Sequence, residues 1–197
     1  MNQSMWIGVL FVVALLGGGI WYMQAQNDSM MQNGTQQDAM DTGKQDGVMV
    51  GGALMIRERD IVDNALLASN VTTVVAAVKA AGLVDTLKSV GPFTVFAPTN
   101  AAFEKLPAGT VETLLKPENK SKLVDILTYH VVAGRYTSAD LKDGMMLTTV
   151  QGKTLVIKKD VSGKIWINGS AMVETPDVIS SNGVTFVIDA VLIPAAN

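Results

Sequence analysis

Residues 91–103 read GPFTVFAPTNAAF, a stretch that joins a backbone breaker, a strand and the start of a helix. Gly91-Pro92 interrupts regular structure, and Phe93 to Ala97 is rich in the aromatic and β-branched residues typical of strands. A second proline ends the strand, and Thr99 or Asn100 can then cap a following helix, AAFEKL. The stretch therefore predicts a strand that runs directly into a helix.

The chain on both sides of this stretch has helical apolar spacing. Before it, residues 61–82 form two such segments, with Asn70 as the expected N-cap of the second and Gly82 as its stop. After it, residues 110–115 and 120–128 are helical in pattern, and the latter segment leads directly into Tyr129-His130. The first half of the domain is therefore expected to be rich in short helices.

Beyond Arg135 the apolar pattern changes to a period of two. The strand-like segments LTTV, TLVIKK, KIWIN, AMVET and VTFVID are separated by the hairpin turn signals Gln151-Gly152, Ser162-Gly163, Asn168-Gly169 and Asn182-Gly183. A helix-rich half followed by a strand-rich half predicts an α+β fold rather than alternating βαβ units.

The N-terminal region predicts a membrane anchor and a tether. Residues 5–23 carry no charge and as a helix would extend about 28 Å, close to the ~30 Å hydrocarbon core of a bilayer. Trp6 and Trp21-Tyr22 stand near its two ends, where aromatic rings prefer the headgroup interface. Residues 1–23 are therefore interpreted as a transmembrane anchor, residues 24–47 as a disordered polar tether and residues 48–197 as the globular domain.

This organisation places the protein in the cell membrane, single-pass, with its C-terminal domain periplasmic or extracellular. The alternative is secretion after signal cleavage, with a candidate cut after Ala25. Cleavage is disfavoured because no Lys or Arg precedes Lys44 and because Met23 would occupy the −3 position.

Composition excludes several function classes. Acidic and basic side chains balance from Val48 onward, so the domain lacks the basic stripe that nucleic-acid binding requires, and no nucleic-acid partner is expected. With no cysteine and with His130 as the only histidine, neither a zinc site nor a metal cofactor is expected. Methionines before the domain show no regular spacing, which disfavours copper binding. No catalytic constellation is present, so the sequence favours a binding module over an enzyme.

Three blocks of this sequence resemble the fasciclin domain family, in its small, single-domain, exported bacterial form. They are residues 91–103, the Tyr129-His130 pair, and residues 182–194, NGVTFVIDAVLIP, all in the family's order. The resemblance implies a wedge-like β-sandwich with several short helices along one side, and a role in cell adhesion and matrix contact. Phe186 departs from the histidine that many relatives carry, so no role for that imidazole transfers.

Two groups of residues are candidates for binding, and neither is a catalytic or metal-binding candidate. One is Tyr129 and His130, with His130 interpreted as a buried, hydrogen-bonded scaffold residue whose partner is expected in the loop backbone around the first block. The other is Asp177-Val178-Ile179, where the resemblance suggests an Asp-aliphatic element linked to receptor contact in animal relatives. The alternative for Asp177 is a turn after Pro176.

Two functions follow from these observations. The first is an adhesion module that contacts a surface protein or polysaccharide, held at the membrane by its N-terminal helix. The alternative is a carrier or sensor of a small hydrophobic ligand in a groove between sheet and helices.

Overall fold

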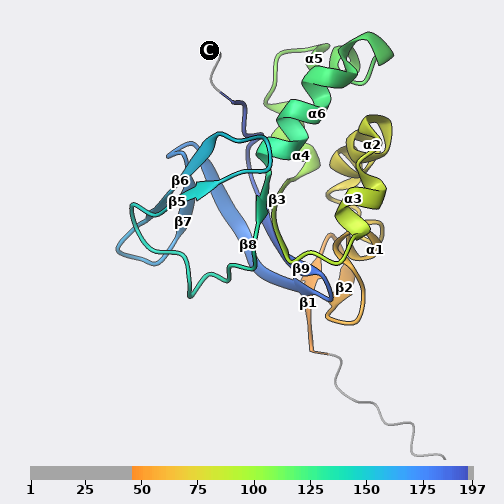
Figure 1. The fold of residues 1–197 in the computed structure, drawn as a ribbon. Coiled ribbons are helices and arrows are strands. Elements are labelled where there is room, and N and C mark those ends of the chain that lie inside the picture. The colour runs from red at the N-terminus through yellow and green to blue at the C-terminus, as the bar shows by residue number, and fades with distance from the viewer. Residues whose placement is uncertain (1–45, 195–197) are drawn as a thin grey trace, which may run out of the picture. The chain divides into compact units, whose positions relative to one another are not determined.

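The computed structural model describes residues 46–194 (Figure 1). The first half contains β1 (Gly47–Val50), β2 (Ala53–Ile56), α1 (Ile61–Ala65), α2 (Thr72–Ala81), α3 (Val84–Lys88), β3 (Phe93–Pro98), α4 (Asn100–Glu104), α5 (Thr110–Leu114), the 3₁₀ turn η1 (Pro117–Asn119) and α6 (Lys120–Tyr129). The second half contains β4 (Val131–Ala133), β5 (Met146–Thr148), β6 (Thr154–Lys159), β7 (Ile165–Ile167), β8 (Ala171–Ser180) and β9 (Gly183–Ile188). The predicted α+β class is confirmed.

Seven strands form one sheet in the order β4-β3-β9-β8-β7-β6-β5, and its two terminal strands meet. Val132 of β4 bridges to Thr149, just after β5, and the N–H of Val150 donates to the Val131 carbonyl at 2.7 Å. Closure satisfies backbone groups that an open edge would leave unpaired. The strands therefore form a barrel-like sheet, where the resemblance implied a sandwich.

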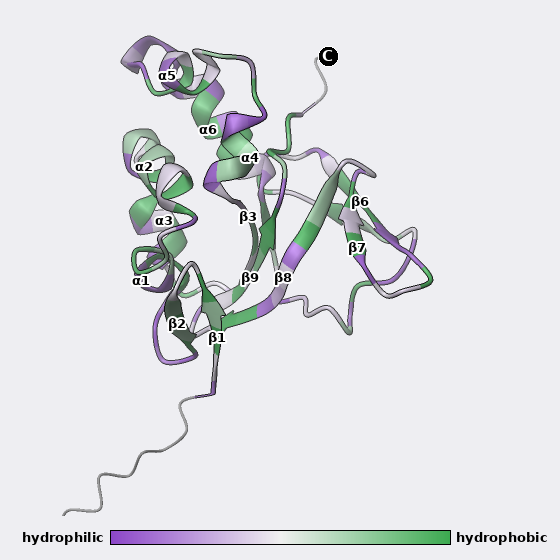
Figure 2. Cartoon of the chain, turned by 180° about the vertical axis from the view of Figure 1, so that it is seen from behind, coloured by the Kyte–Doolittle hydropathy of each residue, from purple (hydrophilic) through white to green (hydrophobic). Residues whose placement is uncertain are grey.

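The parallel pair β3 and β9 is covered on both faces. Inside the barrel-like sheet, Phe96 stacks on Phe186 with ring centroids 5.5 Å apart and planes inclined by 27°. On the outer face, Val95 and Val187 join the clusters under the helices. Two-sided burial explains the nearly continuous apolar runs of these strands, and Figure 2 shows hydrophobic colouring along β9 and on α2.

Helix capping differs from the expectation at one site. Thr99 caps α4 as predicted, since its hydroxyl accepts from the Ala102 N–H at 3.2 Å. Asn70 does not cap α2; Val71 occupies that position, and the Asn100 carboxamide oxygen accepts from the Thr73 N–H at 2.9 Å instead. A side chain from α4 thus satisfies a helix terminus that the local sequence leaves open.

The hairpin of β1 and β2 has no counterpart in the expected elements. Its turn is Gly51-Gly52, and Gly51 has a φ of 55°. The Gly51 carbonyl accepts from the Ser69 N–H at 3.2 Å and from the Ser69 hydroxyl at 2.6 Å, which attaches the turn to the loop before α2. The first described strand therefore begins at Gly47, one residue before the predicted start of the domain at Val48.

The predicted anchor of residues 1–23 and nearly all of the 24–47 tether lie outside the described residues. Within residues 46–194, no helix combines the length and the apolar character needed to cross a membrane.

Candidate binding site

His130 occupies the joint between α6 and β4, and only 3% of its surface is exposed. Its Nε2 accepts from the Leu192 N–H at 3.0 Å, so the ring proton is assigned to Nδ1, which donates to the Ile126 carbonyl at 2.8 Å. The second bond satisfies a carbonyl at the C-terminus of α6 that has no helical partner. The prediction that the imidazole bonds to the loop backbone around the first block was wrong. The imidazole bonds to its own helix and to the segment after β9. It is instead the backbone carbonyl of His130 that binds the first block, accepting from the Phe96 N–H.

Burial sets the protonation state of this histidine. It lowers the pKa of His130 from its ordinary value to about 4, and the hydrogen bond to Ile126, which favours the cation, offsets only part of this. The ring is therefore neutral at neutral pH, with both nitrogens occupied.

Tyr129 is also buried, and its hydroxyl connects α6 to the strand-rich half. The hydroxyl donates to the Thr154 carbonyl at 3.2 Å and accepts from the Asn168 side-chain amide at 3.0 Å. Both members of the Tyr-His pair thus face inward and bond within the domain.

Asp177 lies inside β8 and does not form the expected turn. The chain continues as a strand to Ser180, with an irregularity in its pairing to β9 between Thr175 and Val178. Asp177 has a φ of 55°, and its carboxylate accepts from the Ser138 N–H at 2.7 Å and from the Ser138 hydroxyl. This bulge turns the carboxylate toward the 134–143 loop. The turn interpretation was wrong because pairing with β9 continues on both sides of the bulge.

The side chains of Asp177, Val178 and Ile179 do not all lie on the same face of β8. Val178 is buried in the core under the helices. Asp177 and Ile179 line an open cleft of about 270 Å³ beside β1 and β2, together with Asp46 and Arg57. Only two of the three candidates are therefore positioned to meet a partner, and the Asp177 carboxylate is already hydrogen-bonded.

Substitutions of Asp177 can show whether this residue stabilises the fold or contacts a partner. Asp177→Ala removes both bonds to Ser138 and places a Cβ-bearing residue without them at positive φ, so the free energy of unfolding should fall by about 2 kcal/mol or more. Asp177→Gly loses the same bonds without the backbone strain and should be about 1 kcal/mol more stable than the alanine variant. Urea denaturation measures both. An alanine variant with unchanged stability and weakened surface binding would instead make Asp177 a contact residue.

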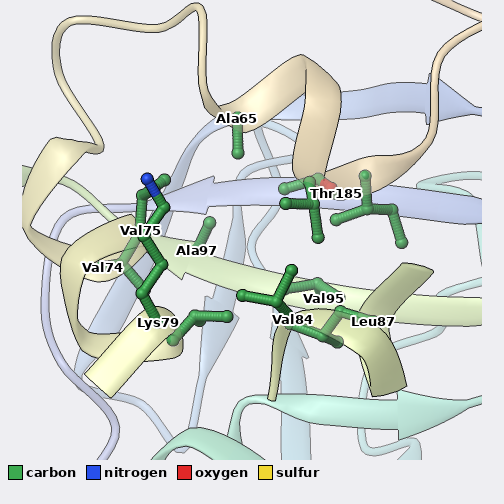
Figure 3. Close-up of a pocket in the computed structure, with 12 residues that line it drawn as sticks. Ala65, Val74, Val75, Lys79, Val84, Leu87, Val95, Ala97 and Thr185 are labelled. Carbon is green, nitrogen blue, oxygen red and sulfur yellow. The ribbon is translucent and has the colours of Figure 1, made fainter. Parts of the chain in front are cut away.

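A second hollow lies between the helices and the outer face of the sheet, and the sequence did not identify its residues. It has a volume of about 50 Å³, and Figure 3 shows its lining side chains converging from α1, α2, α3, β3 and β9. The helices contribute mainly Val and Ala there, small side chains that leave space unfilled. The lining residues are Ile61, Val62, Ala65, Val74, Val75, Val78, Lys79, Val84, Leu87, Val95, Ala97 and Thr185.

Polar bonds hold the walls of this pocket in place. The Asn182 carboxamide accepts from the Ile61 N–H at 3.0 Å and donates to the carbonyls of Leu87 and Ser89 at 2.7 and 3.0 Å. Lys88 adds ion pairs to Asp60 at 2.9 Å and Asp63 at 2.6 Å. α1 and α3 are thereby fixed to each other and to the start of β9.

The three sequence blocks thus fold into β3 with α4, the α6–β4 joint, and β9. A family model for the Fasciclin domain matches residues 69–194, which contain all three. The chain belongs to the fasciclin domain family. Among its relatives, protein sll1483 of Synechocystis sp. is 57% identical over 124 residues, covering 62% of this chain and 67% of that protein. The uncharacterized protein sll1735 of the same organism is 45% identical over 134 residues, covering 68% of this chain and 97% of that protein.

The fasciclin fold is also seen in a solved structure. A domain pair from the insect cell adhesion molecule fasciclin I superposes with a TM-score of 0.63 at 22% identity. The superposition covers 71% of this chain and 52% of that one, so this chain spans about half of the domain pair. At this identity the likeness establishes a shared fold.

Proposed function

We propose that this fasciclin protein is a membrane-tethered adhesion module at the cell surface or in the periplasm, which contacts a surface protein or polysaccharide. The observation that supports it most is the fasciclin domain itself, whose fold is shared with a cell adhesion molecule. The motif side chains of Tyr129, His130 and Asn182 are bonded within the scaffold, so contact with a partner falls to the outer surfaces.

The tether is part of the proposal. The charge-free residues 5–23 have the length and aromatic ends of a spanning helix. The polar residues 24–46, as a flexible coil, would give the domain a reach of about 25–30 Å from the bilayer. A tether of this length would allow the domain to contact partners close to the membrane surface.

One experiment on intact cells tests tether and adhesion together. Cells that express the full chain should bind immobilised protein or polysaccharide fractions of the cell surface, and a protease that cuts within residues 24–47 should release a soluble domain and abolish that binding. A mature protein that begins near Gln26 and is freely soluble would contradict the tether. Equal binding by expressing and non-expressing cells would contradict adhesion.

The apolar pocket supports a second candidate function, the carriage or sensing of a small hydrophobic ligand. All of its exposed lining is carbon, the usual character of such a site. Native mass spectrometry of the purified chain distinguishes the two candidates, because only a carrier should retain a copurified small molecule. A spectrum with the mass of the polypeptide alone would contradict this candidate.

A further inference from the structure

The pocket beneath α1, α2 and α3 is smaller than the pockets that hold drug-sized ligands, and its size suits a single side chain. At about 10–15 Å³ for each water-sized group, its volume of about 50 Å³ admits roughly four such groups. Drug-sized ligands occupy pockets of about 300–1,000 Å³. The carbon atoms of one leucine side chain fill the available space, whereas an aromatic ring or a long acyl chain exceeds it.

The walls of the pocket recognise only apolar groups. Apart from Lys79 and Thr185, every lining residue is aliphatic, from Val75 and Val78 of α2 across to Val95 of β3. An inserted polar group would lose its water without gaining a hydrogen-bond partner from these side chains. The occupant is therefore aliphatic.

Lys79 adds a charge at the rim of this apolar pocket. Its residue is exposed near the C-terminus of α2, and in the part of the chain that the structure describes it has no ion pair or hydrogen-bonding partner for its ammonium group. Figure 3 shows the Lys79 nitrogen at the end of the side-chain cluster beside Val75. A carboxylate next to the inserted aliphatic group would complement this ammonium.

We infer that this pocket is the socket of the adhesion interface: it receives one aliphatic side chain of a partner protein, with an acidic residue of that partner beside Lys79. The inference rests on the proposed adhesion function and selects a protein partner over a polysaccharide. The bonds of Asn182 and Lys88 hold the walls in position before the partner arrives. A pre-formed socket avoids part of the ordering cost of association.

Methyl NMR of the full chain in lipid nanodiscs tests the socket without detergent that could fill it. The probe is N-acetyl-Leu-Asp amide, titrated while the methyl signals of Val75, Val78 and Val84 are followed. Saturable shifts are expected with a dissociation constant on the order of millimolar, since one side chain is buried. The matched N-acetyl-Ala-Asp amide should produce no saturable shift.

Two variants localise the effect. Ala65→Leu fills the pocket from α1 and should weaken the leucine probe by about tenfold or more. Lys79→Gln, at an exposed position, should weaken it about two- to fivefold, and the N-acetyl-Leu-Asn probe should lose the same factor on the unchanged chain. Unchanged shifts of distant methyl groups and an unchanged melting temperature show that each variant is folded.

In the titrations, each of three results would overturn the socket: no saturable shift with the leucine probe, equal shifts with the alanine probe, or binding of decanoate about a hundredfold tighter than the leucine probe. The cell-binding assay keeps this failure distinct from failure of the proposed function. Adhesion that persists undiminished in folded Ala65→Leu would reject the socket and leave the adhesion function standing.

Discussion

Replacing Gly183 by alanine should lower the free energy of unfolding by more than about 3 kcal/mol, a large fraction of the roughly 5–15 kcal/mol by which a typical domain is stable. Gly183 opens β9, where a Cβ atom would lie 2.1 Å from the Phe93 carbonyl oxygen and 2.9 Å from the Ile61 side chain. The carbonyl belongs to the backbone of β3 that pairs with β9, so relief requires moving these two parallel strands apart. Thermal denaturation followed by far-UV circular dichroism measures the loss.

Gly169→Ala is the matched control, because Gly169, like Gly183, directly follows an asparagine at a hairpin connection. A Cβ atom there meets nothing within 4 Å, and the only penalty comes from its φ of 69°. This variant should lose about 1 kcal/mol. Equal losses in the two variants would show that contact of a Cβ atom with β3 is not what makes Gly183 necessary.

His130 should make the stability of the domain depend on pH between about 6.5 and 4. Its folded pKa of about 4 lies below the unfolded value of about 6.5. The unfolded chain therefore binds more protons throughout this window, so stability is complete above it and falls as the pH is lowered. The full difference is on the order of 3 kcal/mol.

Urea denaturation at pH 7, 5.5 and 4.5 measures this dependence, with His130→Gln as the comparison. His130 is the only histidine. Hydrogen bonds from Thr137 and Ser162 lower the pKa values of Asp140 and Asp160, whose contributions are therefore lost only at still lower pH. The glutamine variant should be about 1–3 kcal/mol less stable at pH 7, with a nearly flat profile down to pH 4.5. A wild-type profile that is flat from pH 7 to 4.5 would contradict the buried neutral imidazole.

Elements governed by neighbouring residues were predictable from the sequence. The strand that begins at Phe93, the cap at Thr99 and the hairpin turns at Asn168-Gly169 and Asn182-Gly183 all depend on a few adjacent side chains. Contacts between residues far apart in the chain were not predictable. The His130 imidazole, for example, bonds to Leu192, which lies 62 positions away. Spacing along the chain contains no information about that contact.

The candidate site shows the same limit. Pro176-Asp177 has the local signature of a turn, but pairing within β8 overrides it and leaves a bulge. The socket is the volume left unfilled between Val78, Ala97 and the other lining residues. That volume depends on how the side chains pack in three dimensions. A groove between helices and sheet was part of the alternative hypothesis drawn from the sequence, but the residues that line it could be named only from the structure.

Closure of the seven-stranded sheet also affects how molecules of this protein associate with one another at high concentration. A sheet with free terminal strands offers its backbone as a template on which neighbouring molecules can add strand by strand. Here β4 and the residues after β5 already bond to each other, so that sheet presents no such template. At high density, copies of this domain should therefore not join through the edges of this sheet, and contacts between them should not grow strand by strand from it into fibres.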